Sequence, residues 1–245
     1  PYGKNINYFK EIAKLVKKYK VNLIIPCSDE EALALAKKRN MLETADCVLA
    51  CADYEILKII SNKVKTYDVL KTKNIKVPQY NQVNSIEELK SIVLKYLKNT
   101  GAVVVKPAVG RGGRDVSVIS KNFKNDESIS INNFMDNCIS NYNDLFPLIV
   151  MERLFDPIYD IDMLAYNGKL VKSVVRRRLN PNNPNDGHII ENLPNLHNLA
   201  EKLSNIFELN WLYDCDIMMD ALGEPVILEI NPRPSGSIAI PVAAG

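Results

Sequence analysis

The sequence predicts an α/β protein in which a short parallel α/β segment precedes a larger α+β region of hairpins and helices. Amphipathic helices alternate with short apolar strands over residues 5–61, which is the pattern of a parallel sheet. Residues 159–179 read as two strands around Asn167-Gly168, the preferred two-residue hairpin turn. Residues 227–236 (ILEINPRPSG) begin as an apolar strand and end in a proline-rich turn.

The first region consists of helices and two short strands. Residues 5–19 carry apolar side chains at helical spacing, with lysines on the opposite face. The apolar runs 21–25 and 47–50 read as strands, and helices are expected after each, over 30–40 and 53–61. The region starts with a helix, so we expect that one or two strands precede it in the full protein.

The rest of the chain is predicted to mix helices with hairpins. The expected elements are helix 62–74, extended segment 75–80, helix 85–98, strands 102–107 and 116–120, helix 128–140, strand 148–154, a hairpin over 159–179, helix 195–209 and a hairpin over 213–233. Ser85 and Glu88 form a capping box at the start of one helix. Residues 180–187 can only form a loop, and a helix is expected to follow the last residue.

Composition excludes several classes of function. The chain has 245 residues, of which 47% are hydrophobic and 24% charged, as in ordinary globular proteins. A net charge of +2 gives no argument for nucleic acid or an anionic membrane as a partner. No apolar run approaches the roughly 20 residues that span a bilayer, and no signal-peptide pattern is present. The five cysteines are scattered and only Cys47 and Cys51 lie close together, so we expect reduced thiols in a cytoplasmic protein, with a metal site as the alternative.

Oxygen donors and a cation alternate along the strand near residue 229. Glu229, Asn231 and Arg233 share one face because side chains alternate along a strand. Mg²⁺ prefers oxygen ligands and arginine suits phosphate oxygens, which indicates one end of a magnesium–phosphate site. Asp216, with Asp214 on the same face, lies on the preceding strand and could join them through a hairpin. The plain alternative is a set of exposed polar side chains.

A lysine and three glycines follow one another at the end of a buried strand. Lys106 precedes Gly110, Gly112 and Gly113, whose backbone N–H groups could face phosphate oxygens. A strand, a glycine loop and a second strand resemble the flap over nucleotide phosphates in kinases and similar folds. The alternative is an ordinary glycine-rich hairpin.

Other polar groups give weaker signals. Arg176 and Arg178 share a strand face, and one of them could contact phosphate, although a charge run is usually solvated. His188 lies in the polar loop and could reach substrate, although a loop histidine is more often a plain surface residue. Neither His188 nor His197 has a partner typical of a catalytic triad.

Seven motifs occur in the order and spacing of the ATP-grasp superfamily. They are a lysine opening helix 62–74, VVVKPAVGRGG, MERL, YDIDML, RRR, DCDIMMD and LEINPRPSG. The set is most similar to the carbamoyl-phosphate-synthase-like branch. The resemblance implies a partial pre-ATP-grasp domain over 1–62 and an ATP-grasp domain over 63–245. In the latter, a flap subdomain covers about 100–150 and a metal and phosphate subdomain about 151–245, with a truncated C-terminus.

The resemblance also implies a role for individual residues. The expected nucleotide-binding residues are Lys63, Lys106, Gly110, Gly112, Gly113, Glu152, Arg153, Leu154 and Asp160. The expected Mg²⁺ ligands, with Mn²⁺ as the alternative ion, are Asp216, Glu229 and Asn231. The expected catalytic residues are Arg233 with Arg178 or Arg176. The chain departs from the family at Ile158, where an acid usually binds the ribose, and Asp156 or Asp160 is the candidate substitute.

The resemblance implies an ATP-dependent ligase. Such an enzyme activates a carboxylate as an acyl-phosphate, which an amine or similar nucleophile then attacks. The expected partners are small-molecule carboxylate and amine substrates, and a homodimer is left open. The alternatives are a non-catalytic nucleotide-binding regulatory module and one half of a carbamoyl phosphate synthase large subunit. The sequence does not name the acyl donor or acceptor.

Overall fold

The computed structural model describes residues 3, 5–44, 46–110, 115–121, 129–181 and 186–244. The chain divides into two compact units. The first unit comprises Pro1–Ser61, Asp156–Met219 and Gly223–Gly245, and the second comprises Asn62–Phe155 and Asp220–Leu222. The described part of the chain contains no helix long and apolar enough to cross a membrane.

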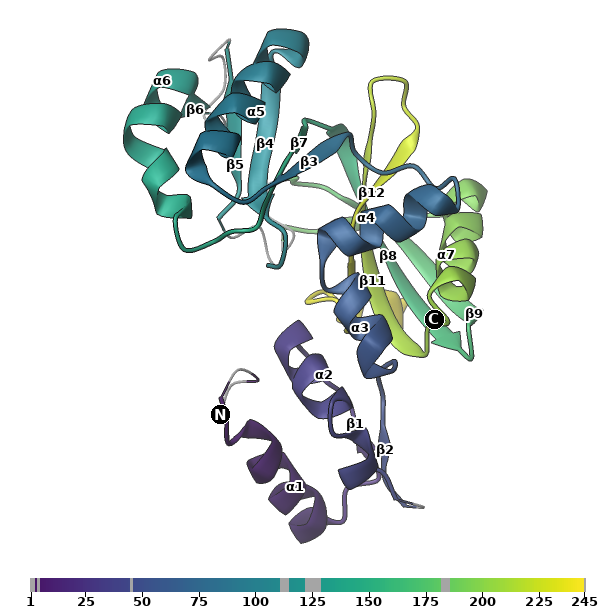
Figure 1. Ribbon diagram of the computed structural model, residues 1–245. Coiled ribbons are helices and arrows are strands. Elements are labelled where there is room, and N and C mark those ends of the chain that lie inside the picture. The colour runs from purple at the N-terminus through teal and green to yellow at the C-terminus, as the bar shows by residue number, and fades with distance from the viewer. Residues whose placement is uncertain are drawn as a thin grey trace. The chain divides into compact units, whose positions relative to one another are not determined.

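The first unit begins with helices around a two-stranded parallel sheet (Figure 1). Its elements are α1 (Tyr8–Tyr19), β1 (Leu23–Ile24), α2 (Asp29–Ala36), a 3₁₀ turn (Arg39–Met41), β2 (Val48–Leu49) and α3 (Tyr54–Ile60). Ser28 caps α2 by accepting a hydrogen bond from the Glu31 backbone N–H at 3.3 Å. The parallel pairing of β1 with β2 confirms the predicted α/β segment.

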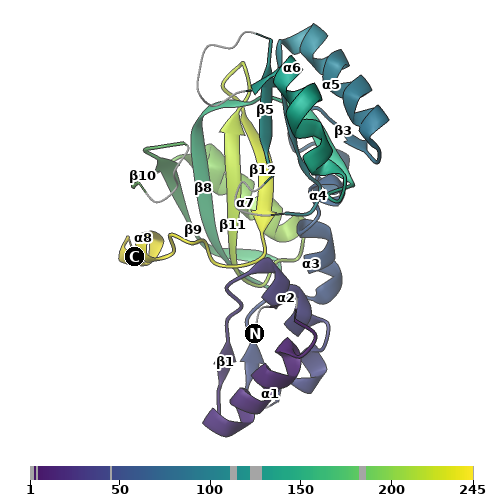
Figure 2. The ribbon, with the colours of Figure 1, turned by 90° about the vertical axis from the view of Figure 1, so that its left-hand side faces the viewer.

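The rest of the first unit is a five-stranded sheet in the order β10-β9-β8-β11-β12 (Figure 2). The elements are β8 (Phe155–Tyr166), β9 (Lys169–Arg178), β10 (His188–Glu191), α7 (Pro194–Ile206), β11 (Trp211–Met219), β12 (Pro225–Asn231) and α8 (Ala239–Ala243). Helix α7 packs on β9 and buries Leu196, Ala200 and Leu203. The middle of β8 is buried from Tyr159 to Met163 without a break, so its polar residues are covered as well as its apolar ones.

The second unit is a five-stranded sheet in the order β3-β7-β4-β5-β6. Its elements are α4 (Lys63–Thr72), β3 (Tyr80–Val83), α5 (Ile86–Thr100), β4 (Ala102–Pro107), β5 (Ser117–Ser120), β6 (Ile129–Ser130), α6 (Ile131–Asn133), a π-helical turn (Phe134–Cys138), a 3₁₀ turn (Ile139–Tyr142) and β7 (Leu148–Glu152). The core includes Leu89, Val93 and Leu97 of α5 together with Val103 and Val105 of β4.

Several predicted elements are confirmed, and one is wrong in its details. Strands β4 and β5 pair antiparallel, as expected for the two strands that flank the glycine-rich connection. The helix expected over 128–140 instead starts as a two-residue strand that pairs in parallel with β5, and Ser130 caps the short helix behind it. Pairing with β5 fixes Ile129 and Ser130 in an extended conformation, and local sequence does not reveal such a partner.

The turn between β8 and β9 has the conformation that its sequence predicts. Asn167 has φ 47° and Gly168 has φ 75°, so both central residues are left-handed. We expect Gly168→Ala to lower the free energy of unfolding by about 1–2 kcal/mol, because a Cβ is disfavoured at this φ. Urea denaturation measures the change.

Gly236 serves as the control for this substitution. A Cβ built on Gly236 meets nothing within 4 Å, and its φ lies outside the left-handed range. Gly236→Ala should therefore leave stability unchanged or slightly higher. Equal losses in the two variants would contradict the backbone explanation.

Candidate functional site

The polar end of the β11–β12 hairpin brings three carboxylates and an amide together. Asp214 pairs in register with Asn231, and Asp216 pairs with Glu229. The Asn231 side-chain amide donates to Asp214 Oδ2 at 3.2 Å and lies 3.5 Å from Asp216 Oδ1. The predicted hairpin is therefore confirmed, and it places the three expected metal ligands on neighbouring positions of two strands.

Two arginines of β9 reach this carboxylate group from the adjoining part of the sheet. Arg176 and Arg178 share one face of the strand, as predicted, whereas Arg177 pairs with Glu191. The Arg178 guanidinium donates to both oxygens of Asp160 and to Asp216 Oδ2 at 3.0 Å. Its side chain is 14% exposed, so part of the guanidinium remains accessible.

Arg176 is the more deeply buried of the two, with a side chain only 1% exposed. Its Nε donates to Asp162 Oδ2 at 2.5 Å. Its Nη1 and Nη2 atoms lie 3.7 Å from Asp160 and 3.8 Å from Asp214. Because three carboxylates surround Arg176, it neutralises charge inside the unit and is shielded from solvent.

The carboxylates of this group differ in how readily they ionise. Burial, together with the neighbouring Glu229 carboxylate, raises the pKa of Asp216 to about 7 against the opposing effect of Arg178. Burial and the Asp216 charge hold the pKa of Asp214 well above its ordinary value. Burial alone would raise the pKa of Asp160, but the hydrogen bond from Arg178 outweighs it, so that pKa is lowered. Asp160 therefore ionises at lower pH than an ordinary carboxyl group, whereas Asp214 and Asp216 keep their protons to higher pH.

The donor set suits a hard divalent cation. One carboxylate oxygen from each of Asp160, Asp214 and Asp216 lies within 4.8 Å of the others. Asp214 Oδ1 is buried and has no hydrogen-bond partner among the described residues. Carboxylate oxygens are the donors that Mg²⁺ and Mn²⁺ prefer.

Sequence reasoning missed part of this group. It assigned Asp160 to the nucleotide and left Asp214 outside the metal set, because the contact between them depends on β8 and β11 lying side by side in the sheet. The available signal was the repeated Asp-x-Asp pattern, at 160 and 162 in one strand and at 214 and 216 in another.

The expectation that His188 lies on the surface is wrong. His188 begins β10 and pairs in register with Arg178, and its side chain is 1% exposed. Its Nε2 lies 3.3 Å from Asp160 Oδ2, and neither ring nitrogen has a hydrogen-bond partner in the described structure. Burial and the charge of Arg176 lower its pKa. Sequence analysis did not predict β10, because this short strand directly follows the polar loop at 180–187.

His197 has a simpler environment. Its Nδ1 lies 2.7 Å from Ser173 Oγ, on the side of the sheet where α7 packs on β9. A serine–histidine pair requires an acid to resemble a catalytic triad, and no acid is recorded beside His197 among the described residues.

The predicted phosphate-binding lysines lie in the second unit. Lys63 opens α4 and is buried, and its Nζ donates to the Gly110 carbonyl at 2.7 Å. Its backbone N–H donates to the Ala108 carbonyl at 3.0 Å. Lys106, near the end of β4, is also buried. The start of α4 is therefore fixed to the segment that follows Lys106.

The remaining predicted nucleotide residues are only partly described. Gly112 and Gly113 lie outside the described residues. Glu152 ends β7 and exchanges two hydrogen bonds with Gln79, at 2.7 Å and 3.0 Å. Leu154 is buried, and Arg153 lies between them in the chain. Their expected role in reading adenine stays a prediction.

Arg233 follows β12 in the first unit. Its Nη1 donates to the Pro234 carbonyl at 2.9 Å, and its Nε lies 3.4 Å from Asp29 at the start of α2. The side chain is 16% exposed, so it is held by neighbours on one side and still accessible. Its predicted phosphate contact stays a prediction.

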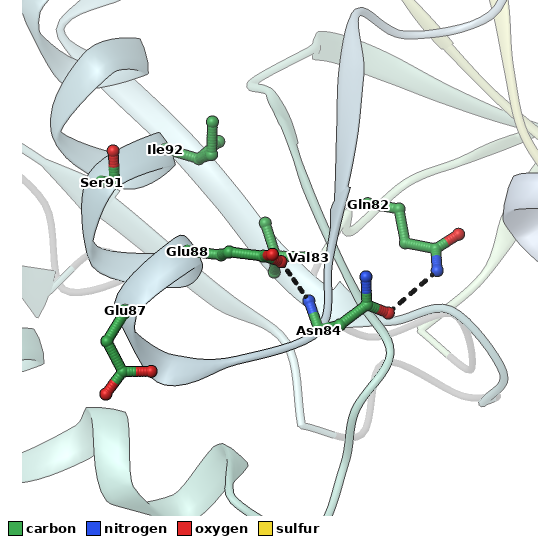
Figure 3. A pocket seen from close by; sticks show the side chains of 7 residues that line it. All are labelled: Gln82, Val83, Asn84, Glu87, Glu88, Ser91 and Ile92. Atoms are coloured by element: carbon green, nitrogen blue, oxygen red, sulfur yellow. Dashed lines mark hydrogen bonds between the residues drawn. The ribbon is translucent and has the colours of Figure 1, made fainter.

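A separate open hollow of about 480 Å³ lies between β3 and the start of α5 (Figure 3). Glu88 lies in it, but its carboxylate accepts the Asn84 backbone N–H at 2.7 Å and so completes the helix cap. The Asn84 amide oxygen accepts a hydrogen bond from Gln82. These polar groups satisfy one another, and the predicted site residues do not line this hollow.

Two ATP-grasp family models match separate parts of the chain. A model of the sugar-transfer associated ATP-grasp matches residues 44–140, and a model of the ATP-grasp in the biosynthetic pathway with Ter operon matches residues 144–245. An uncharacterised protein from Methanocaldococcus jannaschii is 27% identical over 185 residues, covering 73% of this chain and 42% of that protein. The chain thus spans less than half the length of this curated relative.

Solved structures share the fold at low sequence identity. D-alanine–D-alanine ligase from Bacillus anthracis, complexed with ATP, is 15% identical with a TM-score of 0.67, covering 98% of this chain and 78% of that chain. D-alanyl-alanine synthetase A from Vibrio cholerae is 14% identical with a TM-score of 0.65, covering 86% of this chain and 67% of that chain.

The buried charge of Arg176 gives a stability prediction. Arg176→Met should lower the free energy of unfolding by about 3–5 kcal/mol, because three buried carboxylates lose their shared cation. Urea denaturation of the purified chain measures the loss.

Arg177→Met is the matched control, one residue away on the opposite face. Its ion pair with Glu191 involves side chains that are 32% and 25% exposed, so the loss should be much smaller. Similar losses in the two variants would show that Arg176 does not have the special role assigned to it.

Proposed function

We propose that the chain, parts of which match two ATP-grasp family models, is an ATP- and Mg²⁺-dependent ligase. It would activate a small-molecule carboxylate as an acyl-phosphate for attack by an amine or similar nucleophile. The observation that carries the proposal is the group of oxygen donors at Asp216, Glu229 and Asn231 with the Arg178 guanidinium beside it.

Residues of each unit have separate roles in this proposal. In the second unit, Lys63, Lys106 and the backbone from Gly110 onward bind the nucleotide phosphates, and Glu152 to Leu154 contact adenine. The hydrogen bond from Lys63 Nζ to the Gly110 carbonyl supports this, because it places an ammonium group at the glycine-containing segment that follows Lys106. In the first unit, Asp216, Glu229 and Asn231 hold the cation. Bound Mg²⁺ supplies neutralising charge to the phosphate oxygens.

The three arginines have different electrostatic roles in this proposal. Arg178 and Arg233 are both partly exposed and can stabilise negative charge on a phosphoryl group as it is transferred. Arg176 is enclosed by carboxylates, so we assign it the role of orienting Asp160, Asp162 and Asp214. We therefore assign the catalytic role to Arg178 rather than to Arg176. The proposed reaction requires neither a serine nor a cysteine nucleophile.

The finer assignment is to the carbamoyl-phosphate-synthase-like branch. It rests on the order and spacing of the motifs from VVVKPAVGRGG to LEINPRPSG. We also propose domain limits of 1–62 for the pre-ATP-grasp part and 63–245 for the ATP-grasp part. The substrates are small molecules that carry a carboxylate and an amine.

Two substitutions test the ligase proposal. Lys106→Ala and Glu229→Gln should each reduce ATP-dependent phosphate release by roughly a hundredfold, because each removes a group that stabilises the transferred charge. Phosphate release is measured with Mg-ATP and a panel of carboxylates and amines, and calorimetry measures Mg-ATP binding in parallel.

The controls are the exposed positions Lys98→Ala and Glu201→Gln, both on helices. They should retain full activity. Undiminished turnover in Lys106→Ala and Glu229→Gln would refute the ligase assignment. Mg-ATP binding with no turnover on any substrate pair would favour a non-catalytic nucleotide-binding module.

A further inference from the structure

One buried side chain beside Arg178 has no role in the proposed function. His188 is the first residue of β10 and pairs in register with Arg178 of β9, so the two side chains are cross-strand neighbours on one face. The His188 side chain is 1% exposed, and neither ring nitrogen is hydrogen-bonded within the described part of the chain. Polar atoms are rarely buried in this way, so the imidazole needs an explanation.

Stability does not supply that explanation. Burying an imidazole without a hydrogen bond costs free energy, whereas an apolar side chain of similar size avoids this cost. His197, the second histidine of the chain, shows the ordinary arrangement, because its Nδ1 lies 2.7 Å from Ser173 Oγ. The position of His188 is therefore expected to serve function rather than folding.

The recorded polar contact of His188 is with Asp160. Its Nε2 lies 3.3 Å from Asp160 Oδ2, within hydrogen-bond distance, although the ring is not turned into hydrogen-bond geometry. A small rotation of the ring would aim an Nε2–H group at this oxygen. Arg176 Nη1 lies farther from the same oxygen, at 3.7 Å. After Arg178, His188 is thus the nearest recorded donor to Asp160 Oδ2.

Asp160 in turn determines how Arg178 is held. Arg178 Nε donates to the two Asp160 oxygens at 2.9 Å and 3.1 Å, and Nη2 donates to Asp160 and to Asp216 Oδ2. Arg178 Nη1 has no recorded contact with the described residues, and the side chain is 14% exposed. Because a guanidinium group is planar and rigid, the direction of Nη1 depends on the orientation of the Asp160 carboxylate.

We propose that His188 is a positioning residue of the ligase reaction: its Nε2–H group holds the Asp160 carboxylate, which keeps Arg178 Nη1 directed at the transferred phosphoryl group. This role rests on the proposed function, because that function makes Arg178 catalytic. His188 itself touches neither substrate nor metal in this arrangement. A side chain of this kind supports catalysis by restricting the motion of a catalytic group.

Removal of the imidazole should separate activity from stability. His188→Leu should lower kcat for ATP-dependent phosphate release by about tenfold to a hundredfold and leave KM for Mg-ATP nearly unchanged, because only the aim of a catalytic group is lost. The midpoint of urea denaturation should stay equal or rise, since an unsatisfied polar group is removed. His188→Gln keeps an N–H donor and should recover most of the lost kcat.

His197→Leu is the matched control at the other histidine. It breaks the contact with Ser173 on the side of the sheet where α7 packs on β9, so the urea midpoint should fall while kcat stays at the wild-type value. The two leucine variants should thus show opposite patterns. Circular dichroism checks that each variant is folded, and His188→Met, with the same expected result, replaces His188→Leu if the latter does not fold.

Nuclear magnetic resonance measures the coupling between His188 and Arg178 without turnover. The Arg178 Nε–H signal is assigned by its loss in Arg178→Lys. Its exchange with solvent should be several times faster in His188→Leu than in the wild-type chain, because the Asp160 carboxylate that accepts this hydrogen is less firmly held. The exchange rate should be unchanged in His197→Leu.

The outcomes separate this proposal from the ligase proposal. Wild-type kcat in His188→Leu, a parallel loss of kcat and urea midpoint in both His188 variants, or an unchanged Arg178 exchange rate would each overturn the role of His188. An absence of turnover in the wild-type chain would count against the ligase proposal instead, and the exchange rate would then decide whether His188 holds Arg178.

Discussion

The buried ion cluster around Arg176 is the constraint on which the first unit depends. A guanidinium that is 1% exposed lies against carboxylates from two other strands, β8 and β11. An interior charge is tolerated only when partners hold it in place, so each of these strands must keep its register. The central sheet is therefore fixed by polar contacts on one face and by the packing of α7 on β9 on the other. The same contacts orient Asp214, which lies two residues before the proposed cation ligand Asp216 on β11.

The sequence predicted those parts of the fold that local signals determine. The Asn167-Gly168 dipeptide predicts the turn of the β8–β9 hairpin. Ser85 predicts the start of α5, and its side chain accepts a hydrogen bond from the Glu88 backbone N–H at 3.2 Å. Alternation along β9 placed Arg176 and Arg178 on a common face. Each of these features depends on residues only a few positions apart, so a pattern in the sequence is sufficient to reveal them.

The features that sequence analysis missed all depend on distant pairing. Asp160 meets Asp214 because β8 lies beside β11, although more than fifty residues separate the two positions in the chain. His188 is buried because β10 adds to the edge of β9. Ile129 is extended because β5 offers a parallel partner. Such contacts follow from the arrangement of the sheet, which no short stretch of sequence encodes.

The pairing of β11 with β12 shifts register between Asp216 and Ile217. Asp216 pairs with Glu229 and Ile217 with Ile227, so Leu228 is an extra residue that interrupts the ladder as a bulge. The acidic positions lie on one side of this bulge and the connecting turn at 220–224 on the other. Insertions or deletions in that turn can thus be absorbed before they reach the carboxylates. A change in the length of this turn would leave the spacing of Asp214, Asp216 and Glu229 as it is.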